Sequence, residues 1–158
     1  MFIAFRAITY ATLFIGLSLI YLPARVLGWS GIVRPAAIQW PQVVGIILGS
    51  AGAVVALWCV FTFVSIGKGT PAPFDPPRRL VIRRAYRFVR NPMYMGAGLA
   101  LAGAPLFFKS APLLVYVCVF LLVAHLFVMV YEEPTLRRTF GTDYEAYCDR
   151  VRRWAPRV

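Results

Sequence analysis

Near the middle of the chain lies the segment RRAYRFVRNPMYMG, residues 83–96, where arginine and tyrosine residues immediately precede a long apolar run. A second polar group, YEEP at residues 131–134, follows the end of another apolar run. Both groups therefore adjoin predicted membrane helices at their boundary with water. We expect them to meet at one membrane face, where a charged ligand could be held.

The composition indicates a membrane protein. Hydrophobic residues make up 60% of the chain, and the mean hydropathy is +0.70. Only 15% of the residues are charged, against about 25% in a typical soluble domain. We expect an all-α integral membrane protein with about four transmembrane helices, forming one domain over residues 1–158. The four apolar runs are Ala7–Leu22, Val43–Val64, Pro92–Phe108 and Pro112–Tyr131.

The distribution of basic residues predicts the orientation. Arg6, the Ser65–Asn91 loop and the tail after Tyr131 together carry 14 of the 17 lysines and arginines, and all lie on one predicted side. Such a bias is typical of the cytoplasmic side, so we expect both termini in the cytoplasm and the protein in the inner or plasma membrane.

The net charge of +11 then has a membrane explanation, and no nucleic-acid partner is expected. The first run lacks a convincing cleavage site after Tyr21, which favours a retained helix over a signal peptide.

The segments between the apolar runs carry further predictions. The proline-rich stretch Gly67–Pro77 should not be helical, whereas Arg78–Val89 predicts a short interfacial helix with Arg83, Arg87 and Arg90 on one face. A helical tail should follow the last run. Gly96, Gly98 and Gly103 predict close packing of Pro92–Phe108 against the next helix. Gly96 also lies one turn from the polar cluster.

Four side chains of the first polar group are candidates for ligand binding: Tyr86, Arg90, Asn91 and Tyr94. Simpler explanations exist for some of them. Asparagine followed by proline is a common helix start, with Asn91 as the N-cap and Pro92 in the first turn. Tyrosine is common at membrane boundaries. The conjunction of two phenols, a guanidinium and an amide is what favours a binding site.

The acidic pair Glu132 and Glu133 is the second candidate group. A carboxylate is disfavoured at the C-terminal end of a helix, so either the helix continues or Pro134 opens a second one. Glu133 could simply pair with Arg137, or either acid could balance the basic loop. Because adjacent residues point about 100° apart on a helix, we expect one glutamate to face the site and the other to support it.

The ordered motifs resemble those of the isoprenylcysteine carboxyl methyltransferase and phospholipid methyltransferase superfamily. They are YRxxRNPxYxG at residues 86–96, EExxL at 132–136 and FGxxYxxY at 140–147, and the similarity extends over about residues 69–156. The resemblance implies an integral membrane enzyme that uses S-adenosylmethionine. Residues 65–158 would form the methyltransferase-like core, and residues 1–64 an N-terminal helical hairpin.

The resemblance also implies roles for individual residues. Roles closest to the reaction fall on Arg90, Glu132 and Glu133. Cofactor binding is implied for Tyr86, Arg90, Asn91, Pro92, Tyr94, Gly96, Glu132 and Glu133. The chain departs from the family pattern at Asn91, where histidine is common, and at Arg84-Ala85, where Gly-Pro is common. An asparagine cannot take up a proton, so a histidine-based acid–base role would be absent.

The chemistry of methyl transfer fits these residue types. Displacement at a sulfonium depends mainly on positioning; tyrosine rings can face the cation, and arginine can pair a carboxylate. The acceptor would be a lipid-like or small hydrophobic molecule that presents a carboxylate, amine or thiol. His125, an ionisable residue inside the last apolar run, is a candidate for substrate binding, although a packing role is equally compatible.

Two other functions remain open. A sterol-reductase-like enzyme would use NADPH in a related pocket, with the Arg83, Arg87 and Arg90 face near the 2′-phosphate. A non-catalytic membrane scaffold would use the same charges only as anchors. Cys59, Cys118 and Cys148 have neither disulfide-like nor metal-like spacing, and no metal site is expected.

Overall fold

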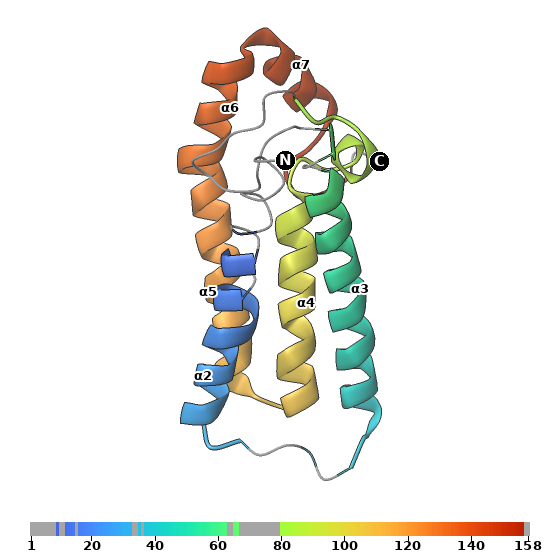
Figure 1. The fold of residues 1–158 in the computed structure, drawn as a ribbon, viewed down its shortest axis with the longest axis vertical. Helices are drawn as coiled ribbons and strands as arrows, with labels where there is room; N and C mark the ends of the chain where they lie inside the picture. The colour runs from blue at the N-terminus through green and yellow to red at the C-terminus, as the bar shows by residue number, and fades with distance from the viewer. Residues whose placement is uncertain are drawn as a thin grey trace.

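The computed structural model describes residues 9, 12–14, 16–32, 35, 37–62, 65–66 and 80–156. These residues form helices and connecting turns, and the described part contains no strand (Figure 1). The principal helices are α2 (Leu22–Trp29), α3 (Trp40–Thr62), α4 (Pro92–Phe108), α5 (Ala111–Phe127), α6 (Glu133–Phe140) and α7 (Thr142–Arg150). The predicted non-helical stretch Gly67–Pro77 lies outside the described residues.

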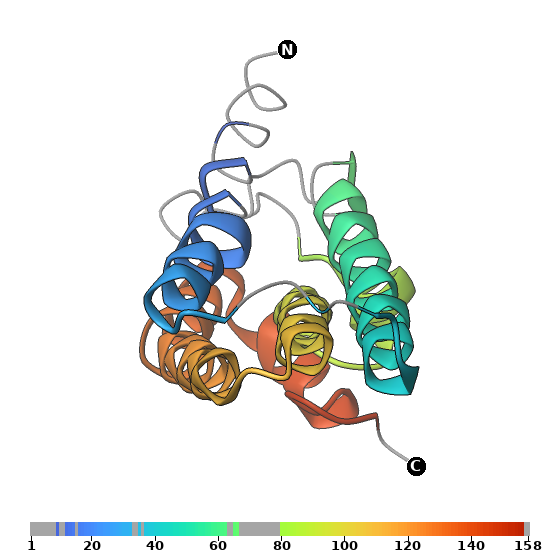
Figure 2. The same ribbon diagram turned by 90° about the horizontal axis from the view of Figure 1, so that it is seen from below.

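Each of the four predicted apolar runs is helical where the structure describes it, and the prediction of an all-α membrane protein is confirmed. Among the described residues, three helical spans are long and apolar enough to cross a membrane: Thr12–Trp29, Trp40–Thr62 and Ala111–Phe140. The shorter apolar helix α4 has the predicted bounds. Viewed along the bundle, α4 lies between α3 and α5, and α2 packs against α5 (Figure 2). The outer faces of these helices expose large apolar side chains, as expected for surfaces in contact with lipid.

The first span ends later than predicted. The predicted end is Leu22, but the π-helical segment η1 (Gly16–Tyr21) continues into α2, which ends at Trp29. Pro23 lies in the first turn of α2. A proline leaves a carbonyl of the preceding turn without its helical N–H partner, and in that turn the Ser18 carbonyl accepts a hydrogen bond of 2.7 Å from the Tyr116 hydroxyl of α5.

The closest helix contact joins α3 and α4. A Cβ atom added to Gly52 would lie 2.2 Å from the Ala100 nitrogen, and one added to Gly103 would lie 2.4 Å from the Gly45 carbonyl oxygen. Real Cβ contacts are essentially never that short. The two backbones therefore touch, and only glycine leaves room for this approach.

The predicted packing of the α4 glycines against the next helix, α5, is correct for only one of the three glycines. Gly98 does face the next helix, where an added Cβ would meet the Leu121 side chain of α5. Gly96 and Gly103 instead pack against α3. The reason is that α3 also carries small residues, including Gly45 and Gly52, opposite those of α4. The backbones of α3 and α4 can therefore approach most closely.

The last apolar run continues well past the predicted end at Tyr131. After α5, the π-helical segment η4 (Val128–Glu132) leads directly into α6, so that helical structure extends unbroken from Ala111 to Phe140. Pro134 occupies the first turn of α6. The chain then turns at Gly141, whose φ is +52°, and enters α7. Both alternatives considered for this region are therefore partly correct. The helical structure continues past Tyr131, and Pro134 also lies in the first turn of the α-helical segment α6.

The predicted interfacial helix over Arg78–Val89 is wrong for the residues that the structure describes. Arg83 is extended, with φ −114° and ψ 163°, and only the single 3₁₀ turn η3 (Arg84–Arg87) follows. Arg84 has a left-handed φ of 58°. Arg83, Arg87 and Arg90 therefore do not share a helix face. This segment is held by tertiary bonds instead, since the Tyr147 hydroxyl donates to the Tyr86 carbonyl at 2.6 Å.

Candidate functional site

The two polar groups of the sequence meet at one end of the bundle. The Tyr94 hydroxyl, one turn into α4, donates a hydrogen bond of 3.1 Å to Oε2 of Glu132 at the end of η4. A second connection joins Arg90 Nη2 and Glu133 Oε1, which are 3.3 Å apart. The predicted convergence of residues 91–94 with the glutamates is therefore present in the fold.

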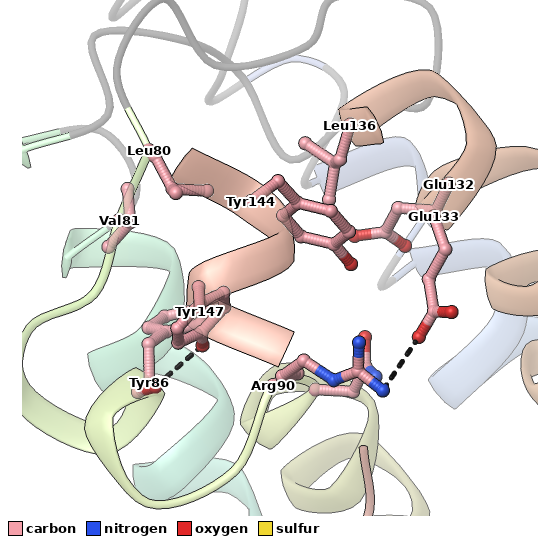
Figure 3. Close-up of a pocket in the computed structure, with 10 residues that line it drawn as sticks. Leu80, Val81, Tyr86, Arg90, Glu132, Glu133, Leu136, Tyr144 and Tyr147 are labelled. Atoms are coloured by element: carbon pink, nitrogen blue, oxygen red, sulfur yellow. Dashed lines mark hydrogen bonds and ion pairs between the residues drawn. The ribbon is translucent and has the colours of Figure 1, made fainter. Parts of the chain in front are cut away.

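A small cavity of about 40 Å³ lies between these groups (Figure 3). It is lined by Leu80, Val81, Tyr86, Arg90, Asn91, Glu132, Glu133, Leu136, Tyr144 and Tyr147. Such a volume holds a few water molecules, whereas pockets for drug-sized ligands measure about 300–1,000 Å³. A larger ligand can bind here only if the lining side chains move apart.

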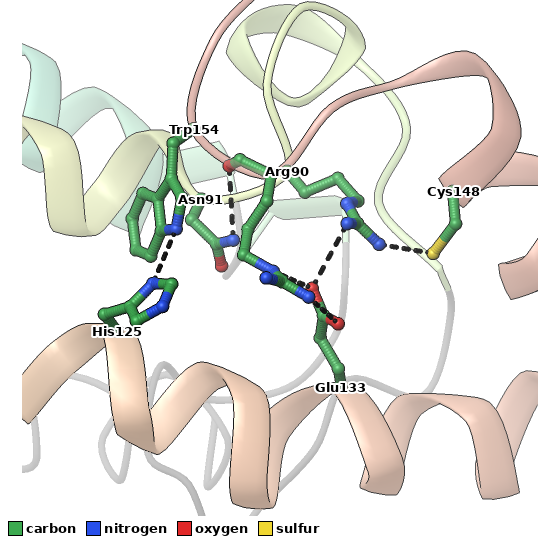
Figure 4. Close-up of polar contacts among 7 residues, drawn as sticks. Arg90, Asn91, His125, Glu133, Cys148 and Trp154 are labelled. Carbon is green, nitrogen blue, oxygen red and sulfur yellow. Dashed lines mark hydrogen bonds and ion pairs between the residues drawn. The ribbon is translucent and has the colours of Figure 1, made fainter.

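Glu133 is held between two arginines, and all three side chains are at least partly buried. Arg153 Nε donates to Oε1 at 2.7 Å and its Nη2 donates to Oε2 at 2.8 Å, which is a bidentate pair. Figure 4 marks the polar contacts of the labelled Glu133 side chain. Arg90 approaches the same carboxylate only through Oε1. The exposed side-chain fractions are 9% for Glu133, 12% for Arg90 and 29% for Arg153. The hydrogen bonds to Glu133 raise the pKa of Arg153 above its usual value.

Arg90 is incompletely paired. Its Nη1 donates to Cys148 Sγ, and its backbone N–H donates to the Arg152 carbonyl at 3.0 Å. Its Nε is buried and has no hydrogen-bond partner among the described residues. A buried unsatisfied donor costs about 1–3 kcal/mol, so this arginine is the group at the cavity with most to gain from a further acceptor.

Asn91 occupies the predicted N-cap position of α4, but its side chain makes no capping hydrogen bond. Its Nδ2 donates instead to the carbonyl oxygen of Arg153 at 3.3 Å. The predicted helix start is correct, but the side chain is oriented by its bond to a distant segment and does not cap the helix. Pro92 is buried in the first turn of α4, as predicted.

Three buried tyrosines also line the cavity. Burial raises the pKa values of Tyr86, Tyr144 and Tyr147, so their phenols are neutral at physiological pH. Tyr86 packs against Cys59 and Val81. These rings supply apolar faces and neutral hydroxyl groups next to the charged cluster.

Four of the predicted site residues do not line the cavity: Pro92, Tyr94, Gly96 and His125. Tyr94 adjoins it through its hydrogen bond to Glu132, and Pro92 lies in the first turn of α4. Gly96 faces α3, where an added Cβ would lie 2.7 Å from the Ala56 nitrogen. His125 is half-buried, and its Nδ1 accepts a hydrogen bond from Trp154 Nε1 at 2.9 Å. These contacts give Gly96 and His125 a packing role.

The sequence predictions missed the contribution of the C-terminal segment. Tyr144, Tyr147 and Cys148 belong to α7, and Arg153 and Trp154 follow it. One signal was available in the sequence: Tyr144 and Tyr147 belong to the FGxxYxxY motif, and together with Val151 they recur with helical spacing. All three are buried in the structure. The pairing of Arg153 with Glu133 had no such signal, because a tail arginine at a membrane boundary most often faces solvent or lipid headgroups.

The fold and the site together define a class: an integral membrane protein of apolar helices with a charged and aromatic site at one end of the bundle. Residues 40–143 match the family model described as phospholipid methyltransferase, about two thirds of the chain. The chain therefore belongs to this family of membrane methyltransferases, and the predicted resemblance is confirmed. No curated protein and no solved structure gives a significant match.

Proposed function

We propose that the protein transfers a methyl group from S-adenosylmethionine to a lipid-like acceptor at the polar end of the bundle. The observation that carries this proposal is the meeting of Arg90 with Glu132 and Glu133 around one cavity, with Tyr94 hydrogen-bonded to Glu132 beside it. When bound, S-adenosylmethionine supplies a methyl group on a sulfonium; the carbon–sulfur bond breaks as an acceptor lone pair bonds to the carbon, and a thioether leaves.

The residues at the cavity suit the other parts of such a donor. The Glu132 carboxylate can accept hydrogen bonds from ribose hydroxyls or from an ammonium group. The Arg90 guanidinium, whose buried Nε lacks a described partner, can pair a carboxylate. Tyr144 offers a ring face to an adenine or to a sulfonium cation. The donor set therefore fits S-adenosylmethionine, although the cavity must widen to admit it.

The widening can occur where packing is loosest. Leu80 and Leu136 line the cavity and are only partly buried, against the cluster of Tyr144, Tyr147 and Val151. Moving partly exposed side chains costs less than opening the glycine contact between α3 and α4. We therefore expect the site to open at these leucines while the helices stay in place.

The acceptor would reach the site from the bilayer. The apolar outer faces of the helices suit a molecule with a hydrocarbon part, and its nucleophile would be an amine, a carboxylate or a thiol. The family description, phospholipid methyltransferase, favours a phospholipid headgroup as acceptor. Of the three nucleophiles, the amine is the one that suits such a headgroup. A reacting amine loses a proton after transfer, and Glu132 is a cavity-lining carboxylate without an arginine partner among the described residues.

One argument for the reductase alternative is not supported by the structure. The expected 2′-phosphate site was a helix face shared by Arg83, Arg87 and Arg90, but Arg83 is extended. Purified full-length protein in lipid nanodiscs, titrated with S-adenosylmethionine and with NADPH, tests the choice. We expect saturable binding of S-adenosylmethionine alone. Binding of NADPH alone would favour the reductase, and binding of neither would favour the scaffold.

The orientation needs a separate test. We propose that the polar end faces the cytoplasm of the inner or plasma membrane, because exposed arginines gather there, among them Arg87, Arg138 and Arg150. A cysteine replacing Pro73, in a chain whose native cysteines are removed, should react with an impermeant label only from the cytoplasmic side of oriented vesicles. Labelling only from the opposite side would reverse the topology.

A further inference from the structure

The C-terminal strap, residues 151–156, crosses the polar end of the bundle directly after α7. Its backbone carbonyls accept hydrogen bonds from the Arg90 N–H and from the Asn91 side chain. Its Trp154 side chain donates to His125 of α5. The strap thus ties the start of α4 to α5, and it brings Arg153 into the charged cluster (Figure 4).

Arg153 and Arg90 share Glu133 unequally. Arg153 uses the fork formed by its Nε and Nη2 to engage both carboxylate oxygens, at 2.7 and 2.8 Å. Arg90 makes a single, longer approach of 3.3 Å to one of those oxygens. One negative charge is therefore balanced mainly by Arg153, and the cluster of three keeps one positive charge in excess.

That excess is located at the cavity. Arg90 lines it, whereas Arg153 does not, and the Arg90 Nε has no partner among the described residues. If Arg153 were absent, both oxygens of Glu133 would be open to Arg90. A bidentate pair between those two side chains would then neutralise the guanidinium that faces the cavity.

We propose that Arg153 is a positioning residue: it saturates Glu133 and so keeps Arg90 available for the carboxylate of the methyl donor. This inference rests on the proposed function, because it assigns a donor carboxylate to Arg90. Arg153 does not line the cavity, so it would affect affinity for the donor carboxylate only through Glu133 and Arg90. The tail of the chain thereby becomes part of the binding site.

The test compares S-adenosylmethionine with its decarboxylated analogue, which lacks only the carboxylate. Dissociation constants are measured by calorimetry for the full chain in nanodiscs. In R153Q we expect affinity for S-adenosylmethionine to fall about tenfold or more, as for removal of a charge-assisted hydrogen bond. Affinity for the analogue should change by less than about threefold, because the analogue has no carboxylate for Arg90 to bind.

Three further variants separate this role from net charge and from folding. R152Q removes a neighbouring exposed charge and should leave the ratio of the two affinities near the wild-type value. R153K keeps the charge but loses the fork, so it should show a smaller decrease in the same direction. The double variant R153Q/E133Q removes the competitor for Arg90 and should recover most of the affinity for S-adenosylmethionine.

The outcomes distinguish this inference from the function on which it rests. Equal decreases for both ligands in R153Q, or no recovery in the double variant, would overturn the positioning role while leaving methyl-donor binding intact. A wild-type protein that binds neither ligand would overturn the proposed function and the inference with it. Fluorescence of Trp154, in a chain whose other tryptophans are replaced by phenylalanine, reports independently whether the strap remains docked.

Discussion

The α3–α4 interface and the polar end of the bundle are held together by opposite kinds of contact. At the interface, Gly45 and Gly52 of α3 meet the backbone of α4 with no side chain between them. At the polar end, long side chains from four segments meet, and Glu133 is held by two arginines. The first arrangement tolerates no added atom, whereas the second can exchange partners.

This difference has a physical cause in the surroundings of each region. Lipid tails are as apolar as the helices, so burial alone gives little driving force, and close packing of small residues must join the helices. At the membrane boundary, charged groups are only partly removed from water, and ion pairs with several hydrogen bonds become stable. The rigid region therefore sets the position of α4, and the polar region is free to adapt to a ligand.

The largest effect should follow from filling the glycine interface. In Gly52→Ala the new Cβ would lie 2.2 Å from the Ala100 nitrogen, so α3 and α4 must move apart. Overpacking of this kind costs about 3 kcal/mol or more where backbone blocks relaxation. Thermal unfolding of the purified variant in detergent measures the decrease in stability.

The matched control is Gly28→Ala in α2, where an added Cβ meets nothing within 4 Å. We expect little change, or a slight gain from the better helix propensity of alanine. Equal melting temperatures for the two variants would mean that the α3–α4 contact is looser than the structure has it.

The next effect concerns cofactor affinity at the polar end. Glu132→Gln should weaken binding of S-adenosylmethionine by about 1.5–3 kcal/mol, because a carboxylate in a water-poor site loses charge-assisted hydrogen bonds. That corresponds to about ten- to 150-fold. Glu133→Gln should act mainly on stability, since it leaves Arg90 and Arg153 without their shared acid. Calorimetric titration of both variants separates the two roles.

Glu145→Gln serves as the control for that experiment. Its pair with Arg137, at 3.4 Å, is exposed, and exposed pairs contribute about 0–1 kcal/mol. Affinity should be unchanged. If Glu132→Gln and Glu133→Gln both bind as tightly as this control, neither glutamate contacts the cofactor, and the methyltransferase site must lie elsewhere.

The smallest effect should come from the contact between the strap and α5. Trp154→Phe removes the hydrogen bond to His125 but keeps most of the ring, which should cost about 0.5–1.5 kcal/mol of stability. Trp40→Phe, at a residue that is 77% exposed, provides the comparison in the same unfolding assay. Identical stabilities would argue that Trp154 does not anchor the strap.

The membrane fold was readable from the sequence because its signals are local. Apolar runs, the Asn91-Pro92 helix start and the small residues of α4 each act over a few neighbouring residues. The sequence predictions were wrong where tertiary contacts outweighed a local sequence rule. The first run was predicted to end at Leu22, where α2 instead begins, and residues 78–89 were predicted to be a helix although distant bonds hold η3.

For the candidate site, the sequence alone determined which residue types lie at the membrane boundary and which family they resemble. Tyr94, Arg90 and the two glutamates were all identified in this way. Only the tertiary structure decided the partners: Tyr94 for Glu132, and Arg153 ahead of Arg90 for Glu133. The reason is that polarity and helix propensity are properties of short segments, whereas the sharing of one carboxylate depends on where the folded chain brings its arginines.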